Sequence, residues 1–245
     1  MKTKIYETPQ QLGEAAATQT AILLNDAMNQ KGMARLLMST GASQFETIRH
    51  LRQANVDWSK VEMFHLDEYI GLPQTHPASF VKYLKERFVC DNLPLKPYYI
   101  DGMRPAQSMI DEISAQISKN PIDVALIGVG ENAHIAFNDP PADFDTPSPF
   151  IIVTLDDACK QQQVREGWFS TLDDVPKQAI SISVREILKS TAIISAVPFL
   201  QKAKAVYNTL TQEITPRVPA TILKTHPNWT LYLDNDSAAM LPSEV

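Results

Sequence analysis

The sequence alternates short apolar runs with longer amphipathic stretches over almost its whole length. The clearest run is Ile122–Val129, which reads IDVALIGV and is short, rich in β-branched residues and bounded by turn signals. Apolar strands that alternate with helical segments of about 10–15 residues are typical of a parallel sheet covered by helices on both faces. We therefore predict an α/β fold with a mostly parallel sheet, formed as one domain over residues 1–245.

Strands are expected wherever the same short apolar pattern recurs: Ala34–Met38, Val61–Leu66, Phe150–Leu155, Ala179–Ser183, Thr191–Val197 and Trp229–Leu233. Amphipathic stretches between them predict helices over Pro9–Lys31, Gln44–Ala54, Ser79–Phe88, Pro105–Lys119 and Pro198–Leu210. The first helix has the clearest boundaries, because Thr8 can cap it, Pro9 suits its first position and Gly32 can end it.

Charge and cysteine content exclude several classes of protein. The chain of 245 residues has 22 Lys and Arg against 28 Asp and Glu, a net charge of −6, and no basic stripe that would indicate nucleic-acid binding. No stretch approaches the roughly 18 apolar residues of a membrane span, and the N-terminus lacks the apolar core of a signal peptide. Cys90 and Cys159 lie far apart in no metal-binding spacing. We expect a cytoplasmic protein with two free thiols.

Ligands of such sheets bind outside the carboxyl ends of the strands, so the loops after strands are the places to search. The first is Ser39-Thr40-Gly41-Ala42-Ser43, which precedes a predicted helix. Hydroxyl groups, backbone N–H groups and the helix dipole can together bind an anion such as a phosphate. A plain capped turn fits these residues equally well.

The second loop, expected to run from Asp67 to Ser79, begins with the adjacent carboxylates Asp67 and Glu68. Alternation along the preceding strand predicts that His65 and Asp67 share a face. A carboxylate there can act as a general base if burial raises its pKa. The same residues with His76 leave open a metal site, although no pair has helical ligand spacing, and a solvated acidic loop is a further alternative.

The third loop, Gly128–Ala133, matches the G-x-G-x-x-A pattern of dinucleotide-binding turns. That pattern requires a helix to open at once, and Pro140-Pro141 interrupt any such helix, so NAD binding is disfavoured. The loop instead brings His134 and Asp139 together, and a histidine–carboxylate pair is suited to moving protons near neutral pH. Arg165 and Lys202 are cations that could meet a phosphate, or simply surface charges.

Taken together, these segments resemble the glucosamine-6-phosphate deaminase (isomerase) family. The resemblance covers nearly the whole chain and rests on HLDEYIGLPQTHPASF at His65–Phe80, LIGVGENAHIAFNDP at Leu126–Pro140, the STGAS turn, and the later order of Lys202 and Thr225-His226-Pro227. It implies a Rossmann-like fold, no metal or organic cofactor, and conversion of a hexosamine 6-phosphate to a ketose 6-phosphate and ammonia.

The resemblance also implies a role for each candidate residue. Asp67 would carry a proton between C2 and C1, and His134 would assist ring opening with Asp139 and Asn132 in support. The phosphorylated amino sugar would be held by the following residues: Ser39, Thr40, Gly41, Ala42, Ser43, Glu68, Gly130, Arg165 and Lys202.

Three positions depart from the family's common pattern. Asn132 stands where Asp is frequent, Asp139 where Glu is frequent, and Ala133 where glycine is usual. Because of these changes, a catalytically weak protein that senses a sugar phosphate stays open as an alternative. A second alternative is a hydrolase like the related 6-phosphogluconolactonases. Residues 148–155 contain no cation, so we expect no allosteric phosphate site there. The sequence leaves open whether the protein forms a homo-oligomer.

Overall fold

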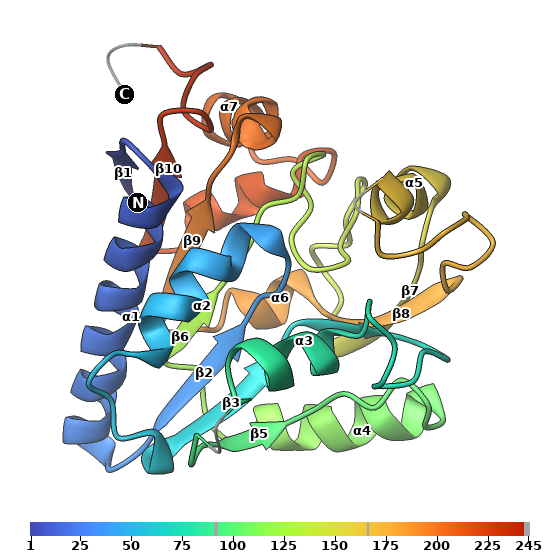
Figure 1. Ribbon diagram of the computed structural model, residues 1–245, viewed down its shortest axis with the longest axis horizontal. Helices are drawn as coiled ribbons and strands as arrows, with labels where there is room; N and C mark the ends of the chain where they lie inside the picture. Colours follow the sequence, from blue (N-terminus) through green and yellow to red (C-terminus); the bar gives the residue numbers. More distant parts are fainter. Residues whose placement is uncertain (91–92, 166, 243–245) are drawn as a thin grey trace.

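A seven-stranded, all-parallel sheet lies at the centre of the computed structural model, which describes residues 1–90, 93–165 and 167–242 (Figure 1). Its strands are listed here in their order across the sheet: β1 (Lys2–Tyr6), β10 (Trp229–Asp234), β9 (Ala192–Val197), β6 (Val124–Leu126), β2 (Ala34–Met38), β3 (Val61–His65) and β5 (Lys96–Tyr98). The middle position of β6 confirms a central strand within the IDVALIGV run, although only Val124–Leu126 of that run form it. The predicted α/β fold is confirmed with it.

The two edge strands, β1 and β5, were not expected from the sequence. β1 reads KTKIY and β5 reads KPY, so neither carries a continuous apolar run. Edge strands are paired on one side only and often carry lysine or proline, which hinder pairing with another chain. Their polar composition therefore follows from their place at the two ends of the sheet.

A second, antiparallel sheet of three strands stands beside the first, in the order β4 (Asp67–Tyr69), β8 (Gln178–Ile182) and β7 (Phe150–Thr154). The prediction that Asp67–Tyr69 belongs to a loop was wrong. A strand of three residues is too short to show alternation, and β4 is formed by pairing with β8, more than 100 residues away in the sequence. In Figure 1 this small sheet extends away from the central one, toward α5.

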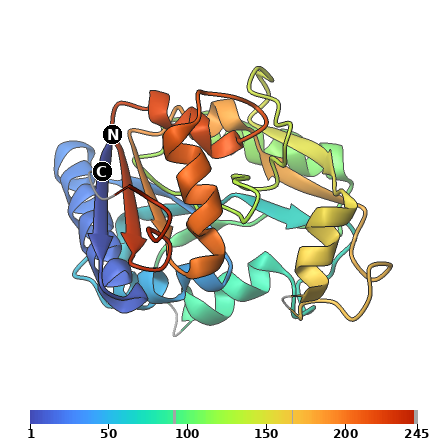
Figure 2. The same cartoon turned by 90° about the horizontal axis from the view of Figure 1, so that it is seen from above.

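Helices cover both faces of the central sheet, as predicted. On one face α1 (Pro9–Lys31), α2 (Phe45–Arg52) and α3 (Phe80–Arg87) pack in one apolar cluster with alternate residues of β2 and β3. On the other, α4 (Ala106–Ile117), α6 (Val184–Ile187), α7 (Ala203–Thr211) and the 3₁₀ segment Pro219–Thr225 complete a second cluster. Figure 2 shows α7 and α1 flanking the strands, while α5 (Asp157–Arg165) stands apart with the small sheet.

The first helix has the predicted ends. Thr8 Oγ1 accepts a hydrogen bond from Gln11 N at 3.3 Å, and Gly32 ends the helix at φ +82°. No helix among the described residues is long and apolar enough to cross a membrane.

Arg35 joins the sheet to α4 from a fully buried position. Its guanidinium donates to Ile117 O at 2.8 Å, to Gln116 O at 2.7 Å and to Asn120 O, and it pairs with Glu62 at 3.1 Å. The ring of Phe64 lies 4.6 Å from the guanidinium carbon. One side chain therefore satisfies the carbonyl groups at the C-terminal end of a helix, where orphan acceptors otherwise need water.

We expect Arg35→Met to lower the free energy of unfolding by about 3 kcal/mol, because it strips buried carbonyl groups and Glu62 of their partner. Urea denaturation followed by circular dichroism measures this change. Arg49→Met is the control, since Arg49 is half exposed and its pairing with Glu46 should contribute about 0.5 kcal/mol. Equal midpoints for the two variants would contradict a structural role for Arg35.

Candidate functional site

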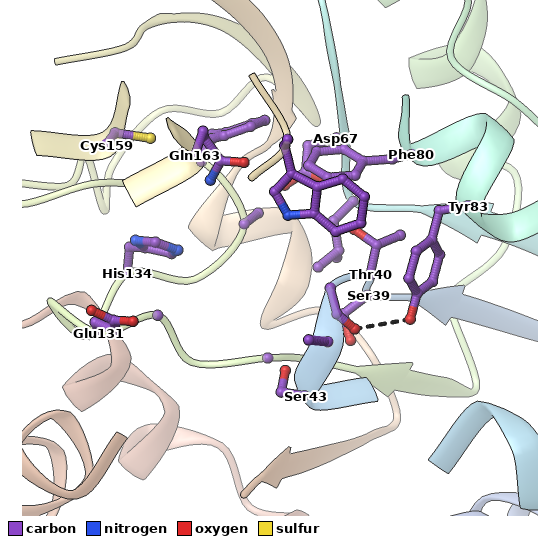
Figure 3. A pocket seen from close by; sticks show the side chains of 18 of the residues that line it. Ser39, Thr40, Ser43, Asp67, Phe80, Tyr83, Glu131, His134, Cys159 and Gln163 are labelled. Carbon is purple, nitrogen blue, oxygen red and sulfur yellow. Dashed lines mark hydrogen bonds between the residues drawn. The ribbon is translucent and has the colours of Figure 1, made fainter. Parts of the chain in front are cut away.

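A cavity of about 740 Å³ lies at the carboxyl ends of β2, β3, β6 and β9, between α3 and α5. Ten of the predicted site residues line it: Ser39, Thr40, Gly41, Ala42, Ser43, Asp67, Gly130, His134, Arg165 and Lys202. Figure 3 shows Ser39, Thr40 and Tyr83 toward one end and His134, Glu131 and Cys159 toward the other. The remaining three predicted residues do not line the cavity. Asn132 and Asp139 contact His134, and Glu68 hydrogen-bonds to Ser79.

The turn after β2 is organised for binding an acceptor group. Gly41 adopts φ +98°, a conformation that favours glycine, and its carbonyl accepts from Tyr83 Oη at 2.9 Å (Figure 3). The chain then enters a 3₁₀ turn, Ala42–Gln44, and α2, whose dipole favours an anion at this end. Ser39 Oγ is buried and has no hydrogen-bond partner among the described residues, so a donor remains available at the cavity wall.

Asp67 opens β4 and presents its carboxylate to the cavity from a position that is 7% exposed. Burial, together with the charge of neighbouring Glu68, raises the pKa of Asp67 well above its ordinary value. No hydrogen bond from the described residues counters that rise, so the ionised form lacks the usual compensation. A carboxylate in this environment is a stronger base than one in water.

Glu68, predicted to bind the substrate, does not line the cavity. Its carboxylate accepts from Ser79 Oγ at 2.7 Å, Val81 N at 2.9 Å and Tyr69 N at 2.9 Å. Adjacent residues of a strand point to opposite sides, and Glu68 therefore holds the N-terminus of α3 while Asp67 faces the cavity. Through that helix it positions Tyr83 in the cavity wall.

The residues weighed as metal ligands do not converge. The predicted alternation ends at Leu66, where the chain passes from β3 to β4, and His65 Nε2 accepts from Ile100 N at 2.8 Å. Burial lowers the pKa of His65 to about 4, so its imidazole is neutral at physiological pH. Of the two residues predicted to share a face, only Asp67 lines the cavity, so His65 takes no part in the site.

His134 and Asp139 form the predicted pair, with Nδ1 and Oδ1 3.0 Å apart. Asn132 connects both residues, because its Nδ2 donates to Asp139 Oδ1 at 3.0 Å and its Oδ1 accepts from His134 N at 3.0 Å. Burial raises the pKa of Asp139, but contacts with His134, Asn132 and Cys159 outweigh that effect and the pKa lies below its ordinary value. The pair therefore combines an ionised carboxylate with an imidazole at the cavity wall.

Gly130 gives the imidazole its space. A Cβ at this position would lie 2.3 Å from Nε2 of His134, closer than two nonbonded atoms approach. Ala133 adopts φ +66°, so the turn takes the left-handed conformation usual for glycine although alanine occupies it. That conformation costs an alanine about 1 kcal/mol. The departure at Ala133 therefore leaves the backbone path of the loop compatible with His134 lining the cavity.

The two predicted cations line the cavity from different segments. Arg165 ends α5 and pairs with Glu131 at 2.7 Å. Lys202 lies in the 3₁₀ turn Leu200–Lys202 after β9, preceded by Phe199 at φ +84°. Sequence reasoning missed Tyr83, Glu131 and Cys159, since a tyrosine within a helix, a loop glutamate and an isolated cysteine carry no local signal of a site.

Comparison with known proteins gives the family. The family described as glucosamine-6-phosphate isomerases/6-phosphogluconolactonase matches residues 7–232, and the chain belongs to this family. Glucosamine-6-phosphate deaminases of Bacillus cereus and Bacillus thuringiensis are 31% identical over 98% of this chain and 89% of theirs.

Solved structures agree on the fold. One described as a monomeric glucosamine-6-phosphate deaminase has a TM-score of 0.89 at 28% identity, covering 98% of this chain and all of that one. A 6-phosphogluconolactonase from Shewanella baltica has a TM-score of 0.80 at 20% identity, covering 96% and 97%. At that lower identity the likeness extends to the fold alone.

Proposed function

We propose that the protein is a hexosamine-6-phosphate deaminase, which converts glucosamine 6-phosphate or its galactosamine epimer, with one water, to a ketose 6-phosphate and ammonia. The observation that carries this proposal is a buried Asp67 carboxylate, with a raised pKa, in the same cavity as the His134–Asp139 pair. The reaction needs these two functions, one to open the sugar ring and one to move a proton between adjacent carbons. The 31% identical relatives are named for this activity.

Ring opening is assigned to His134. The hydroxyl proton on C1 must leave and the ring oxygen must gain a proton as their shared carbon becomes an aldehyde. An imidazole can perform both transfers because one nitrogen accepts while its protonated form donates. Asp139, within 3.0 Å of Nδ1, stabilises the protonated imidazole and fixes the orientation of the ring.

Proton transfer from C2 to C1 is assigned to Asp67. The C2 proton of the open-chain sugar is weakly acidic, so the base must be positioned and only weakly solvated. After it removes the proton, the carboxyl group is neutral, which burial favours, and it can return the proton to C1. O1 gains a proton and the amine nitrogen loses one as the double bond moves to C2=N. The resulting imine at C2 then adds water and releases ammonia.

Phosphate binding is assigned to the Ser39–Ser43 turn with Arg165 and Lys202. The unpartnered Ser39 hydroxyl, the N-terminus of α2 and two cations supply donors of the kind that bind phosphate. A remote phosphate anchor supplies binding energy that orients the reacting carbons. We further infer a cytoplasmic enzyme, in line with the two free cysteines. Whether copies associate, as the sequence leaves open, is measured by light scattering.

The decisive experiment is an ammonia-release assay with glucosamine 6-phosphate, galactosamine 6-phosphate and 6-phosphogluconolactone. Ammonia and a ketose 6-phosphate from either amino sugar are the expected products. Acid release from the lactone without ammonia from the amino sugars would replace the proposal by the lactonase alternative. Tight binding of an amino-sugar phosphate without turnover would identify a sensor.

A further inference from the structure

A buried carboxylate at the end of β10 has no part in the proposed chemistry. Asp234 is 1% exposed and does not line the cavity. Because β10 lies beside β9 in the central sheet, Asp234 stands close to the point where the chain leaves β9 (Figure 1). The segment that follows β9 lines the cavity through Phe199, Gln201 and Lys202. Asp234 therefore supports this part of the cavity wall from behind.

The Asp234 carboxylate accepts hydrogen bonds from the backbone of two segments. Phe199 N lies 3.0 Å from Oδ2 and 3.2 Å from Oδ1, and Ser237 N donates to Oδ1 at 2.7 Å. A carboxylate binds an N–H group more strongly than a neutral acceptor does. The segment after β9 is thus joined to the end of β10 by a charge-assisted contact.

Phe199 adopts backbone angles that suit glycine. Its φ of +84° and ψ of +146° lie in a region that residues with a Cβ rarely occupy, and such residues persist only where their surroundings fix them. Two contacts fix Phe199, because its N–H donates to Asp234 and its carbonyl accepts from Lys202 N at 3.0 Å. The Asp234 carboxylate therefore opposes the tendency of Phe199 to relax to a negative φ.

We propose that Asp234 is a positioning residue, which holds Phe199 at positive φ so that the turn Leu200–Lys202 presents Lys202 to the cavity. The backbone angles of one residue set the direction of the chain that follows it. Relaxation of Phe199 would therefore redirect the turn and move Lys202, which follows within three residues. The inference deepens the proposed function and rests on it, because Lys202 is assigned there to phosphate binding.

Binding of inorganic phosphate, measured by ³¹P NMR, provides a test that needs no turnover. In Asp234→Asn the amide oxygen can keep Ser237 N, the shorter contact, only if Nδ2 faces the N–H of Phe199. We therefore expect Asp234→Asn to weaken phosphate binding about tenfold. Ser237→Ala is the matched control, since it removes the contacts of Ser237 Oγ with the Asp234 backbone and leaves both carboxylate oxygens in place. Equal affinities of the two variants, or no phosphate binding by the wild type, would overturn the proposal.

Two substitutions of Phe199 separate backbone strain from loss of the aromatic ring. Phe199→Gly and Phe199→Ala both remove the ring, but only glycine adopts these backbone angles without strain. Combined with Asp234→Asn, Phe199→Gly should restore phosphate affinity to within about threefold of Phe199→Gly alone, whereas Phe199→Ala should stay about tenfold weaker than Phe199→Ala alone. A carboxylate that only stabilised the fold would not distinguish glycine from alanine, so equal effects would refute the inference.

Thermal unfolding tests the strain with Asp234 in place, which keeps the inference testable if Asp234→Asn does not fold. Phe199→Gly should melt a few degrees above Phe199→Ala, although glycine ordinarily lowers stability. An equal or lower melting temperature for the glycine variant would contradict the role of Asp234. If phosphate affinities and melting temperatures behave as expected but no ammonia is released, the proposed function fails and the role of Asp234 stands. If ammonia is released but Asp234→Asn binds phosphate like the wild type, only the role of Asp234 fails.

Discussion

Asp67→Asn should lower kcat for ammonia release about 10³-fold while leaving KM within a fewfold, because the amide fills the same space but cannot accept the C2 proton. Rapid-quench or coupled ammonia assays measure kcat, and equilibrium binding of the substrate to the inactive variant measures the retained affinity. Solvent deuterium at C1 of the ketose product should appear with the wild type and vanish with the variant. Turnover near the wild-type value would remove Asp67 from the role of base.

The same substitution has a predicted sign for stability. Because burial raises the pKa of Asp67, the folded protein holds a proton that the unfolded chain has lost. Wild-type stability therefore falls as pH rises from the ordinary aspartate pKa near 4 to the raised one, and stays lower above it. The amide of the variant does not titrate, so Asp67→Asn should be as stable as the wild type at low pH and more stable at neutral pH.

Activity should also depend on the ionisation of Asp67, but it should increase with pH over the range in which stability decreases. The base must be ionised, so kcat/KM of the wild type should increase with pH through a pKa that lies above the ordinary aspartate range. Urea denaturation at a series of pH values, with Glu213→Gln as an exposed control, separates the stability effect of Asp67 from general acid unfolding. A gain in stability combined with a loss of activity would mark Asp67 as a residue retained for chemistry and not for folding.

The sequence allowed the central sheet to be predicted because buried strands must be apolar, and β2, β6, β9 and β10 are largely so. The ends of α1 were equally predictable, since Thr8, Pro9 and Gly32 act within one turn of their own positions. Local signals of this kind need no knowledge of distant segments.

Contacts between segments that are distant in the sequence could not be predicted from it. Nothing near Asp67 indicates that Ser181 will pair with it in an antiparallel sheet, and that pairing decides which of Asp67 and Glu68 faces the cavity. Cys159 carries no local signal either, because its place in the cavity wall depends on where α5 packs. The loops singled out after the strands do line one cavity, but the direction of each side chain depended on tertiary pairing.

Gly130→Ala should lower kcat about 100-fold while the protein remains folded. The added Cβ would lie 2.3 Å from His134 Nε2, and the backbone of Gly130 is not in the left-handed region that penalises alanine. The ring, which is the mobile partner, must therefore swing away from its position beside Asp139. A displacement of about 1 Å from the productive geometry is enough for a loss of this size.

Gly128→Ala is the matched control, two residues earlier in the same turn. Its Cβ would meet Gln44 Nε2 at 3.5 Å, an ordinary contact, so kcat should stay within about threefold of the wild type. Equal losses of kcat in both variants would point to a general effect on the loop. Unchanged kcat in both variants would contradict a role for His134 in ring opening. If only Gly130→Ala loses activity, with a melting temperature within a few degrees of the wild type, the orientation of His134 and not the stability of the loop limits catalysis. That outcome would also explain why a chain with only 8 glycines in 245 residues retains one at this position.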